Sequence, residues 1–314
     1  MIAHGHLIAV TGATGFIGLS LCQQLLSQGF AVRILARSPM RAIELENMGA
    51  SVVQGDLDNP EALASLISGC NAIIHGAGVV RGNSQADFDR VNVQGTENLL
   101  AAISVSGLSP RFLLLSSLVA REPNLSWYSR SKHGGEQALL RAPSLDWVIL
   151  RPPAVYGPGD REMLPIFQLM RRGIALVPGS PDARISLIHV TDLVCAIIAC
   201  LQSEEARGQT LSLHDGKSGG YSWREMTDIA ADLWSRRVRL WRVPQGLLNS
   251  VAAINTRMAK ITGHAPMLTP PKLRELRHEN WVVENTRIKQ ATGWEPSIQL
   301  RHGLSGLEIQ RPVE

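Results

Sequence analysis

The sequence has few cysteines and no long apolar run, and both features narrow the class of protein. Its 4 cysteines lie in apolar or helical stretches without metal-type spacing. We therefore expect buried thiols, a reducing compartment and no metal site. The longest apolar run, Leu193–Leu201, is too short to span a bilayer. Because the first apolar run begins only a few residues after Met1, we expect no signal peptide. We therefore expect the protein to be cytoplasmic.

The sequence also lacks a basic stripe interleaved with aromatic residues. Its net charge is +4 and its pI is about 9.1, but lysine and arginine are scattered along the chain. Nucleic acid is therefore not an expected partner, and an anionic cofactor accounts for the basic surplus. A chain of 314 residues is long enough for one large α/β domain and a smaller appendage.

Three glycines near the N-terminus form the most informative motif. The apolar run Leu7–Thr11 precedes them, and Phe16–Ser27 carries apolar residues at helical spacing. Gly12, Gly15 and Gly18 therefore lie at a strand-to-helix junction, which is the arrangement of a dinucleotide-binding turn. The first glycine permits the tight turn, the second admits a pyrophosphate at the helix N-terminus, and the third lets the helix pack closely on the strand.

Further apolar runs alternate with helical patterns as far as Arg151. These strand candidates are Ala31–Ala36, Ser51–Gln54, Ala72–His75, Arg111–Ser116 and Trp147–Arg151. The alternation predicts a Rossmann-type, doubly wound parallel sheet. We expect residues 1–151 to form this dinucleotide-binding domain, with 185–215 returning to it. Residues 152–314 are expected to form mainly a smaller, C-terminal substrate-binding lobe.

The end of the second predicted strand indicates which dinucleotide is preferred. Ala36 stands where an NAD site carries a carboxylate, and Arg37 follows it. An arginine there suits the 2′-phosphate of NADP, so we expect NADP(H) to be preferred over NAD(H). The alternative is a solvated arginine. After the third strand, Asp56 and Leu57 are candidates for holding the adenine, although an aspartate there also serves to cap a turn.

A second constellation follows the fifth predicted strand. Ser116 and Ser117 end that strand, and Tyr128 and Lys132 follow at a spacing that places them on one helical face. A neighbouring ammonium lowers the pKa of a phenol and reaches a cofactor ribose. We therefore expect Tyr128 to exchange a proton with the substrate and Ser117 to hydrogen-bond the reacting oxygen, with Ser116 as the competing serine.

These motifs together resemble the extended branch of the short-chain dehydrogenase/reductase family, which includes nucleotide-sugar epimerases, dihydroflavonol reductases and 3β-hydroxysteroid dehydrogenases. The resemblance is carried by Thr11–Gly18, His75–Gly78, Asn92–Thr96, Ser117, Tyr128, Lys132, Arg151–Gly159, Ile188–Asp192 and Gly293–Pro296. It implies that Ser117, Tyr128 and Lys132 are catalytic. It also implies a cofactor site made of Gly12, Thr14, Gly15, Phe16, Ile17, Arg37, Asp56, Leu57, Ala77, Gly78, Tyr128, Lys132 and Pro153.

Two departures from that family bear on the substrate. The loop between Ser117 and Tyr128 is shorter than in sugar epimerases, and Ile185 and Ser186 interrupt the polar pattern of the sugar enzymes. Both favour a small, apolar carbonyl or alcohol. An apolar stripe at helical spacing in 246–261 agrees, although plain core and a membrane-facing helix are the other interpretations. The stripe consists of Leu247, Leu248, Val251, Ile254, Met258 and Ile261.

The expected function is thus NADP(H)-dependent hydride transfer to or from a carbonyl or alcohol carbon, with Tyr128 as the acid and base. One alternative is a nucleotide-sugar epimerase or dehydratase with bound NAD(P). Another is a non-catalytic NADP(H)-binding sensor or assembly protein, which has little need of a complete serine, tyrosine and lysine set. The resemblance is also consistent with a homodimer formed through helices near 87–105 and 127–140.

Overall fold

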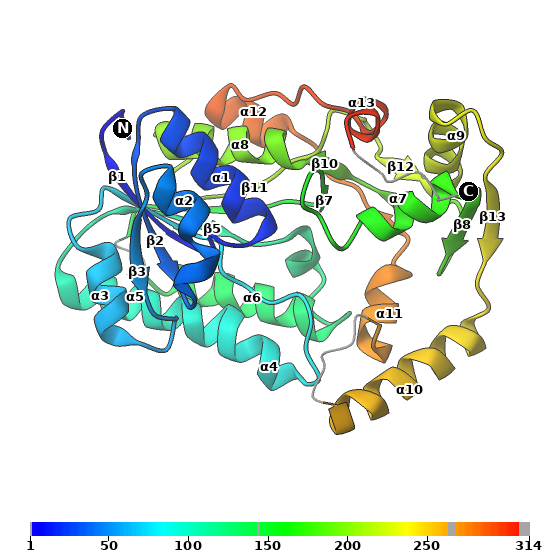
Figure 1. Ribbon diagram of the computed structural model, residues 1–314, viewed down its shortest axis with the longest axis horizontal. Coiled ribbons are helices and arrows are strands. Elements are labelled where there is room, and N and C mark those ends of the chain that lie inside the picture. The colour runs from blue at the N-terminus through cyan, green and yellow to red at the C-terminus, as the bar shows by residue number, and fades with distance from the viewer. Residues whose placement is uncertain (1, 143–144, 263–267, 308–314) are drawn as a thin grey trace.

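The computed structural model describes residues 2–142, 145–262 and 268–307 (Figure 1), and the side chains of 259–262 are not described. Seven parallel strands form the main sheet in the order β11-β6-β5-β4-β1-β2-β3. They are β1 (Leu7–Thr11), β2 (Ala31–Ala36), β3 (Ser51–Gln54), β4 (Ala72–His75), β5 (Arg111–Leu115), β6 (Trp147–Arg151) and β11 (Gln209–Ser212). The predicted doubly wound parallel sheet is therefore confirmed, with β5 one residue shorter than expected.

Helices cover both faces of this sheet, because its strands are apolar on both sides. One face carries α1 (Phe16–Ser27), α2 (Ile43–Asn47), α8 (Val190–Gln202) and α12 (Thr286–Thr292). The other carries α3 (Pro60–Ile67), α5 (Gly95–Ser106) and α6 (Trp127–Leu140), with α4 (Gln85–Asp89) and a π-helical turn (Arg90–Gln94) before α5. Successive side chains of β1 point to opposite faces of the sheet. Ile8 and Val10 belong to the core on the α1 and α8 side, and Ala9 belongs to the core on the α3 and α5 side.

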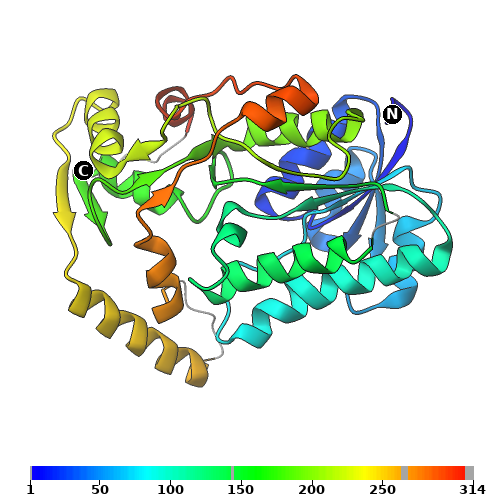
Figure 2. The same cartoon turned by 180° about the vertical axis from the view of Figure 1, so that it is seen from behind.

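The second half of the chain builds a smaller lobe with a core of its own. Its strands are β7 (Ala154–Tyr156), β8 (Ile174–Val177), β9 (Arg184–Ile185), β10 (Leu187–His189), β12 (Tyr221–Ser222), β13 (Arg239–Arg242) and β14 (Asn280–Trp281). Its helices are α7 (Leu164–Arg171), α9 (Trp223–Leu233), α10 (Gln245–Thr262), α11 (Pro270–Leu276) and α13 (Leu300–Ser305). Figure 2 shows these elements at the opposite end of the molecule from β1, β2 and β3.

The segment expected to return to the main sheet divides between the two halves. The β9 and β10 strands pair only within small sheets of the lobe, β10 with β7 and β9 with β12 and β14. Pro152 and Pro153 cannot donate ladder hydrogen bonds and separate β6 from β7, so the chain leaves the main sheet there. It returns through α8 to β11, which pairs with β6. Across residues 2–142, 145–262 and 268–307, no helix has both the length and the apolarity that crossing a bilayer requires.

The packing of α1 on β1 predicts a specific sensitivity at Gly18. A β-carbon at this position would lie 2.1 Å from the Gly12 carbonyl oxygen, which is backbone and cannot rotate away. We expect Gly18→Ala to lower the free energy of unfolding by about 1–3 kcal/mol through overpacking, measured by urea denaturation.

Gly246→Ala is the matched control for this substitution. A β-carbon at Gly246 would meet nothing within 4 Å, and the residue lies inside α10. We expect this variant to be as stable as the wild type or about 0.5–1 kcal/mol more stable. Equal stability of the Gly18→Ala variant and the wild type would show that the close packing of α1 on β1 is wrong.

Candidate active site

A single cleft of about 1700 Å³ runs from the carboxyl ends of the main-sheet strands into the C-terminal lobe. In a doubly wound sheet, ligands bind at this edge, where the strand order reverses. Every residue that the sequence proposed for the site lines this cleft: Gly12, Thr14, Gly15, Phe16, Ile17, Arg37, Asp56, Leu57, Ala77, Gly78, Ser117, Tyr128, Lys132 and Pro153. The fold therefore brings all of them together, from segments up to 141 positions apart in the sequence.

The glycine turn brings two strand ends into direct contact. Gly12 has φ +75°, and a β-carbon there would lie 2.6 Å from the Ala77 nitrogen. Only glycine fits such a position without displacing backbone. Gly15 is the N-cap of α1 and provides no side-chain cap. Because the first N–H groups of a helix lack partners within it, this end of α1 is suited to an anion in the cleft.

A buried histidine fixes the loop that faces the glycine turn. The His75 Nδ1 lies 2.7 Å from Thr11 Oγ1, and its Nε2 lies 3.1 Å from Thr96 Oγ1. The Thr11 hydroxyl also accepts the N–H of Ala77 at 3.2 Å. Burial, with a smaller effect of the Lys132 charge, lowers the pKa of His75 to about 3. His75 is thus a neutral hydrogen-bonding group that holds Ala77 beside the turn.

The far end of the cleft carries the residues proposed for the adenosine. Arg37 is exposed directly after β2, and its guanidinium makes no hydrogen bond or ion pair with any residue that the structure describes. It is free to meet an anionic ligand. Asp56 also lines the cleft, but its Oδ1 accepts the N–H of Asp58 at 2.9 Å, so the turn-capping role is present as well.

The two candidate serines have different partners. Ser116 is buried, and its hydroxyl donates to Glu136 at 2.5 Å. Glu136 also accepts from the Arg151 guanidinium at 2.8 Å, so Ser116 belongs to a buried structural network. Ser117 Oγ instead accepts the Val119 N–H at 3.5 Å, at the start of a 3-10 turn, and Ser117 lowers the pKa of the Tyr128 phenol. Both serines line the cleft, but the Ser116 hydroxyl is occupied by Glu136, so Ser117 stays the predicted partner of the reacting oxygen.

The expected effect of Lys132 on Tyr128 is not seen. The Lys132 ammonium donates to the Leu115 carbonyl at 2.7 Å, and burial lowers its pKa to about 8, opposed by Glu136. Burial raises the pKa of Tyr128 to about 12, with Ser117 lowering it and Glu275 raising it further. The prediction of a lowered tyrosine pKa is wrong for this structure, because burial has the largest effect and the lysine is held by the end of β5.

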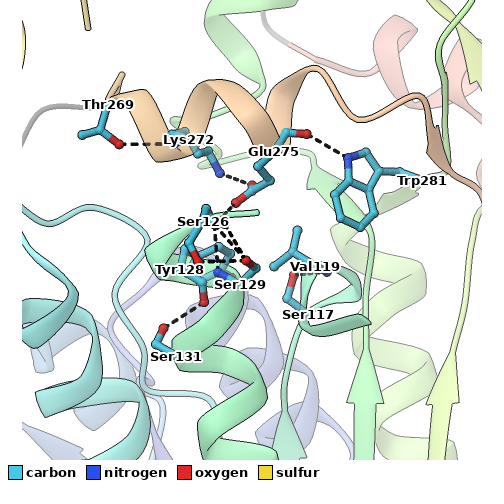
Figure 3. Close-up of polar contacts among 10 residues, drawn as sticks. All are labelled: Ser117, Val119, Ser126, Tyr128, Ser129, Ser131, Thr269, Lys272, Glu275 and Trp281. Carbon is cyan, nitrogen blue, oxygen red and sulfur yellow. Dashed lines mark hydrogen bonds and ion pairs between the residues drawn. The ribbon is translucent and has the colours of Figure 1, made fainter. Parts of the chain in front are cut away.

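A short helix from the C-terminal lobe covers Tyr128, which the sequence did not predict (Figure 3). Lys272 Nζ lies 5.3 Å from the centre of the Tyr128 ring and pairs with Glu275. Glu275 is buried and accepts the Ser126 hydroxyl at 2.5 Å, at the N-cap of α6. Thr269 and the prolines after it are a recognisable helix start, but nothing in their spacing relates α11 to a tyrosine more than 140 residues away.

The half of the cleft beyond Tyr128 is mainly apolar. Its lining includes Met163, Ile166, Leu176, Pro178, Ile185, Trp223, Val243, Leu247, Leu248, Val251, Leu276 and Trp281. Arg184 stands where the nucleotide-sugar enzymes would use an arginine to bind a substrate phosphate, but its guanidinium is bound to other groups of the protein. Its guanidinium donates to the Gly219 and Gly220 carbonyls at 2.5 and 2.9 Å and pairs with Glu225 at 3.2 Å.

Comparisons with known proteins agree with this architecture. A "Ceramide reductase" of Caulobacter vibrioides is 36% identical to the chain, covering 90% of this chain and 88% of that protein. A "2-alkyl-3-oxoalkanoate reductase" of Shewanella oneidensis is 25% identical, covering 95% of this chain and 84% of that protein. The crystallised protein MoeE5, in complex with UDP-glucuronic acid and NAD, shares the fold with a TM-score of 0.73, 23% identity and coverage of 96% and 97% of the two chains.

The model of the NAD dependent epimerase/dehydratase family matches residues 8–213, which include the glycine turn, Ser117, Tyr128 and Lys132. This match covers well over half of the chain, and the reductase from Caulobacter extends the similarity into the second lobe. The chain therefore belongs to the NAD dependent epimerase/dehydratase family and is an NAD(P)-dependent enzyme of the extended short-chain dehydrogenase/reductase type.

Proposed function

We propose that the protein is an NADP(H)-dependent reductase of a ketone on a long-chain, ceramide-like lipid. The observation that carries this proposal is the predominance of apolar side chains, Ile185 and Val251 among them, in the lining of the cleft beyond Tyr128. At about 1700 Å³ the cleft exceeds the volume of an ordinary small-molecule site, so it has room for a dinucleotide and a bulky substrate. The relative named as a ceramide reductase supports the substrate class, and the commitment of Arg184 to backbone carbonyls disfavours a nucleotide sugar.

The residues present fit a dinucleotide. The uncapped start of α1 and the side-chain-free surface of Gly12 would receive the pyrophosphate, and the unpaired Arg37 would receive a 2′-phosphate. Leu57 and Asp56 would hold the adenine. Tyr128 and Lys132 would hold the ribose, with Ala77, Gly78 and Pro153 along the path between the two ends.

In the mechanism we propose, NADPH would, when bound, provide the hydride that the carbonyl carbon receives. Tyr128 donates its phenolic proton to the carbonyl oxygen, so that the product is an alcohol. Since its pKa is raised to about 12, the phenol is protonated at neutral pH and ready for reduction. The Ser117 hydroxyl would orient the oxygen through a hydrogen bond, and Lys132, charged below its pKa of about 8, would hold the cofactor ribose beside it.

Removal of the Tyr128 hydroxyl tests the proposed proton donor. We expect Tyr128→Phe to lower kcat at least 100-fold, as loss of a general acid typically does, and to leave the Kd for NADPH nearly unchanged. Lys132→Ala should impair both quantities. Tyr156→Phe is the matched control, because Tyr156 is buried outside the cleft and its hydroxyl has no hydrogen-bond partner among the described residues. A Tyr128→Phe enzyme that keeps more than about one hundredth of the wild-type rate would contradict the assignment.

The proposed role of Arg37 predicts the cofactor preference. We expect the wild type to bind NADPH more tightly than NADH, and Arg37→Ala to weaken NADPH binding by about 1–3 kcal/mol through loss of a charge-assisted hydrogen bond. Isothermal titration calorimetry with both dinucleotides measures this. NADH serves as the internal control, since its affinity should not change. A wild type that prefers NADH disproves the proposal.

A thermal-shift screen tests the substrate class. With NADP(H) present, we expect a long-chain keto lipid to raise the melting temperature, because a ligand at 100 times its Kd adds about 2.7 kcal/mol of stability. UDP, dTDP and GDP sugars should leave it unchanged. Ile185→Asp, which places a charge in the apolar lining of the cleft, should abolish the lipid effect and keep NADPH affinity. A shift with a nucleotide sugar, absent with free nucleotide and with every ketone, identifies an epimerase instead.

A further inference from the structure

We propose that the rim of the cleft docks on an anionic lipid bilayer. This rim is formed by β8, β13 and α10, and its apolar members are Leu176, Trp241, Leu247, Val251, Ile254 and Met258. The proposal deepens the proposed function, on which it rests for the nature of the substrate.

Exposed apolar side chains concentrate at this rim. Of the 14 large apolar side chains exposed in the described part of the chain, 8 lie between residues 174 and 276. The exposed fractions of Trp241 and Ile254 are 57% and 53%. Exposed leucines or valines scattered singly need no explanation, but a contiguous group at the mouth of a cleft indicates an interaction surface.

The apolar stripe of helix α10 is exposed instead of being covered by a core. Leu247, Val251, Ile254 and Met258 follow at helical spacing and are all exposed, whereas Ala252 is fully buried. Figures 1 and 2 both show α10 at the edge of the molecule, next to α11 and apart from the main sheet. A surface helix normally directs such a stripe into the protein core. An exposed stripe of this kind is suited to contact with the apolar part of a lipid bilayer.

The sheet beside α10 extends the same surface. In the parallel pair of β8 and β13, Trp241 lies opposite Leu176, and both side chains are exposed. Tryptophan is enriched at the boundary between lipid and water. Leu176, Leu247 and Val251 also line the cleft, so the rim adjoins the proposed substrate site. In the proposal, an acyl chain enters the cleft from the bilayer at these three residues.

The charge of this segment favours an anionic partner. Residues 233–274 contain 8 of the 31 lysines and arginines and no aspartate or glutamate. The rest of the chain contains the other 23 basic residues and all 27 acidic residues. The scatter of charge expected from the sequence thus has an exception here. Arg236, Arg237, Arg239, Arg242 and Arg257 are exposed, and none forms an ion pair with a described residue. Basic residues beside an apolar helix face are the pattern of a peripheral, lipid-binding surface.

Co-sedimentation with vesicles tests the proposal without any substrate. We expect the wild type to pellet with vesicles of phosphatidylcholine and phosphatidylglycerol, to pellet less with phosphatidylcholine alone, and to be released by salt. Ile254→Asp and the double substitution Arg236→Glu with Arg237→Glu should each weaken binding by at least fivefold. Met40→Asp is the control, because Met40 is 78% exposed at a site remote from the rim.

Two further measurements separate this surface from the proposed function. Ile254 does not line the cleft, so Ile254→Asp should keep its melting temperature and its rate with a short, water-soluble ketone. Vesicle binding without reduction of any ketone supports the surface and refutes the proposed function. A wild type that stays in the supernatant with anionic vesicles overturns the surface. An Ile254→Asp variant that pellets as the wild type does also overturns it. The same holds if the wild type forms a dimer that Ile254→Asp abolishes and does not bind vesicles.

Discussion

The close approach of Gly12 to the end of β4 is the constraint on which the rest of the site depends. A side chain at position 12 would collide with the Ala77 nitrogen, so the two strand ends can converge only if this residue is glycine. The Thr11 hydroxyl and the buried, neutral His75 then lock the loop against the turn. This convergence points the start of α1 into the cleft and sets the edge of the sheet at which Ser117, Tyr128 and Lys132 meet.

The C-terminal lobe adds what the sheet cannot provide, which is a cover over one side of the tyrosine ring. The α11 helix packs over the start of α6 through Glu275 and Ser126, with Lys272 above the Tyr128 ring. Burial then raises the pKa of Tyr128 to about 12. The same lobe supplies the apolar lining of the cleft and the exposed rim. In the proposed function, the substrate is therefore selected by segments far from the glycine turn in sequence.

The sequence predicted the main sheet, and it predicted which residues line the cleft at the ends of its strands, because both depend on local signals. The alternation of apolar runs gave six of the seven strands, and the glycine spacing located the turn. It could not predict β11 beside β6, the pairing of β9 and β10 within the lobe, or α11 above Tyr128. Each of these is a contact between segments of ordinary composition. The prediction about Lys132 failed for a related reason, since a spacing of four residues says nothing of the Leu115 carbonyl that binds its ammonium.

In the proposed reaction, one cleft brings a nicotinamide dinucleotide and an apolar ketone together over Tyr128. The most direct test of this reaction is NADPH deuterated at the transferable position of nicotinamide C4, incubated with enzyme and a long-chain keto lipid. Mass spectrometry should find deuterium on the carbon that bore the carbonyl, with one NADPH oxidised per alcohol formed. An alcohol without deuterium, or isomerisation of a nucleotide sugar without net oxidation of NADPH, would contradict the account.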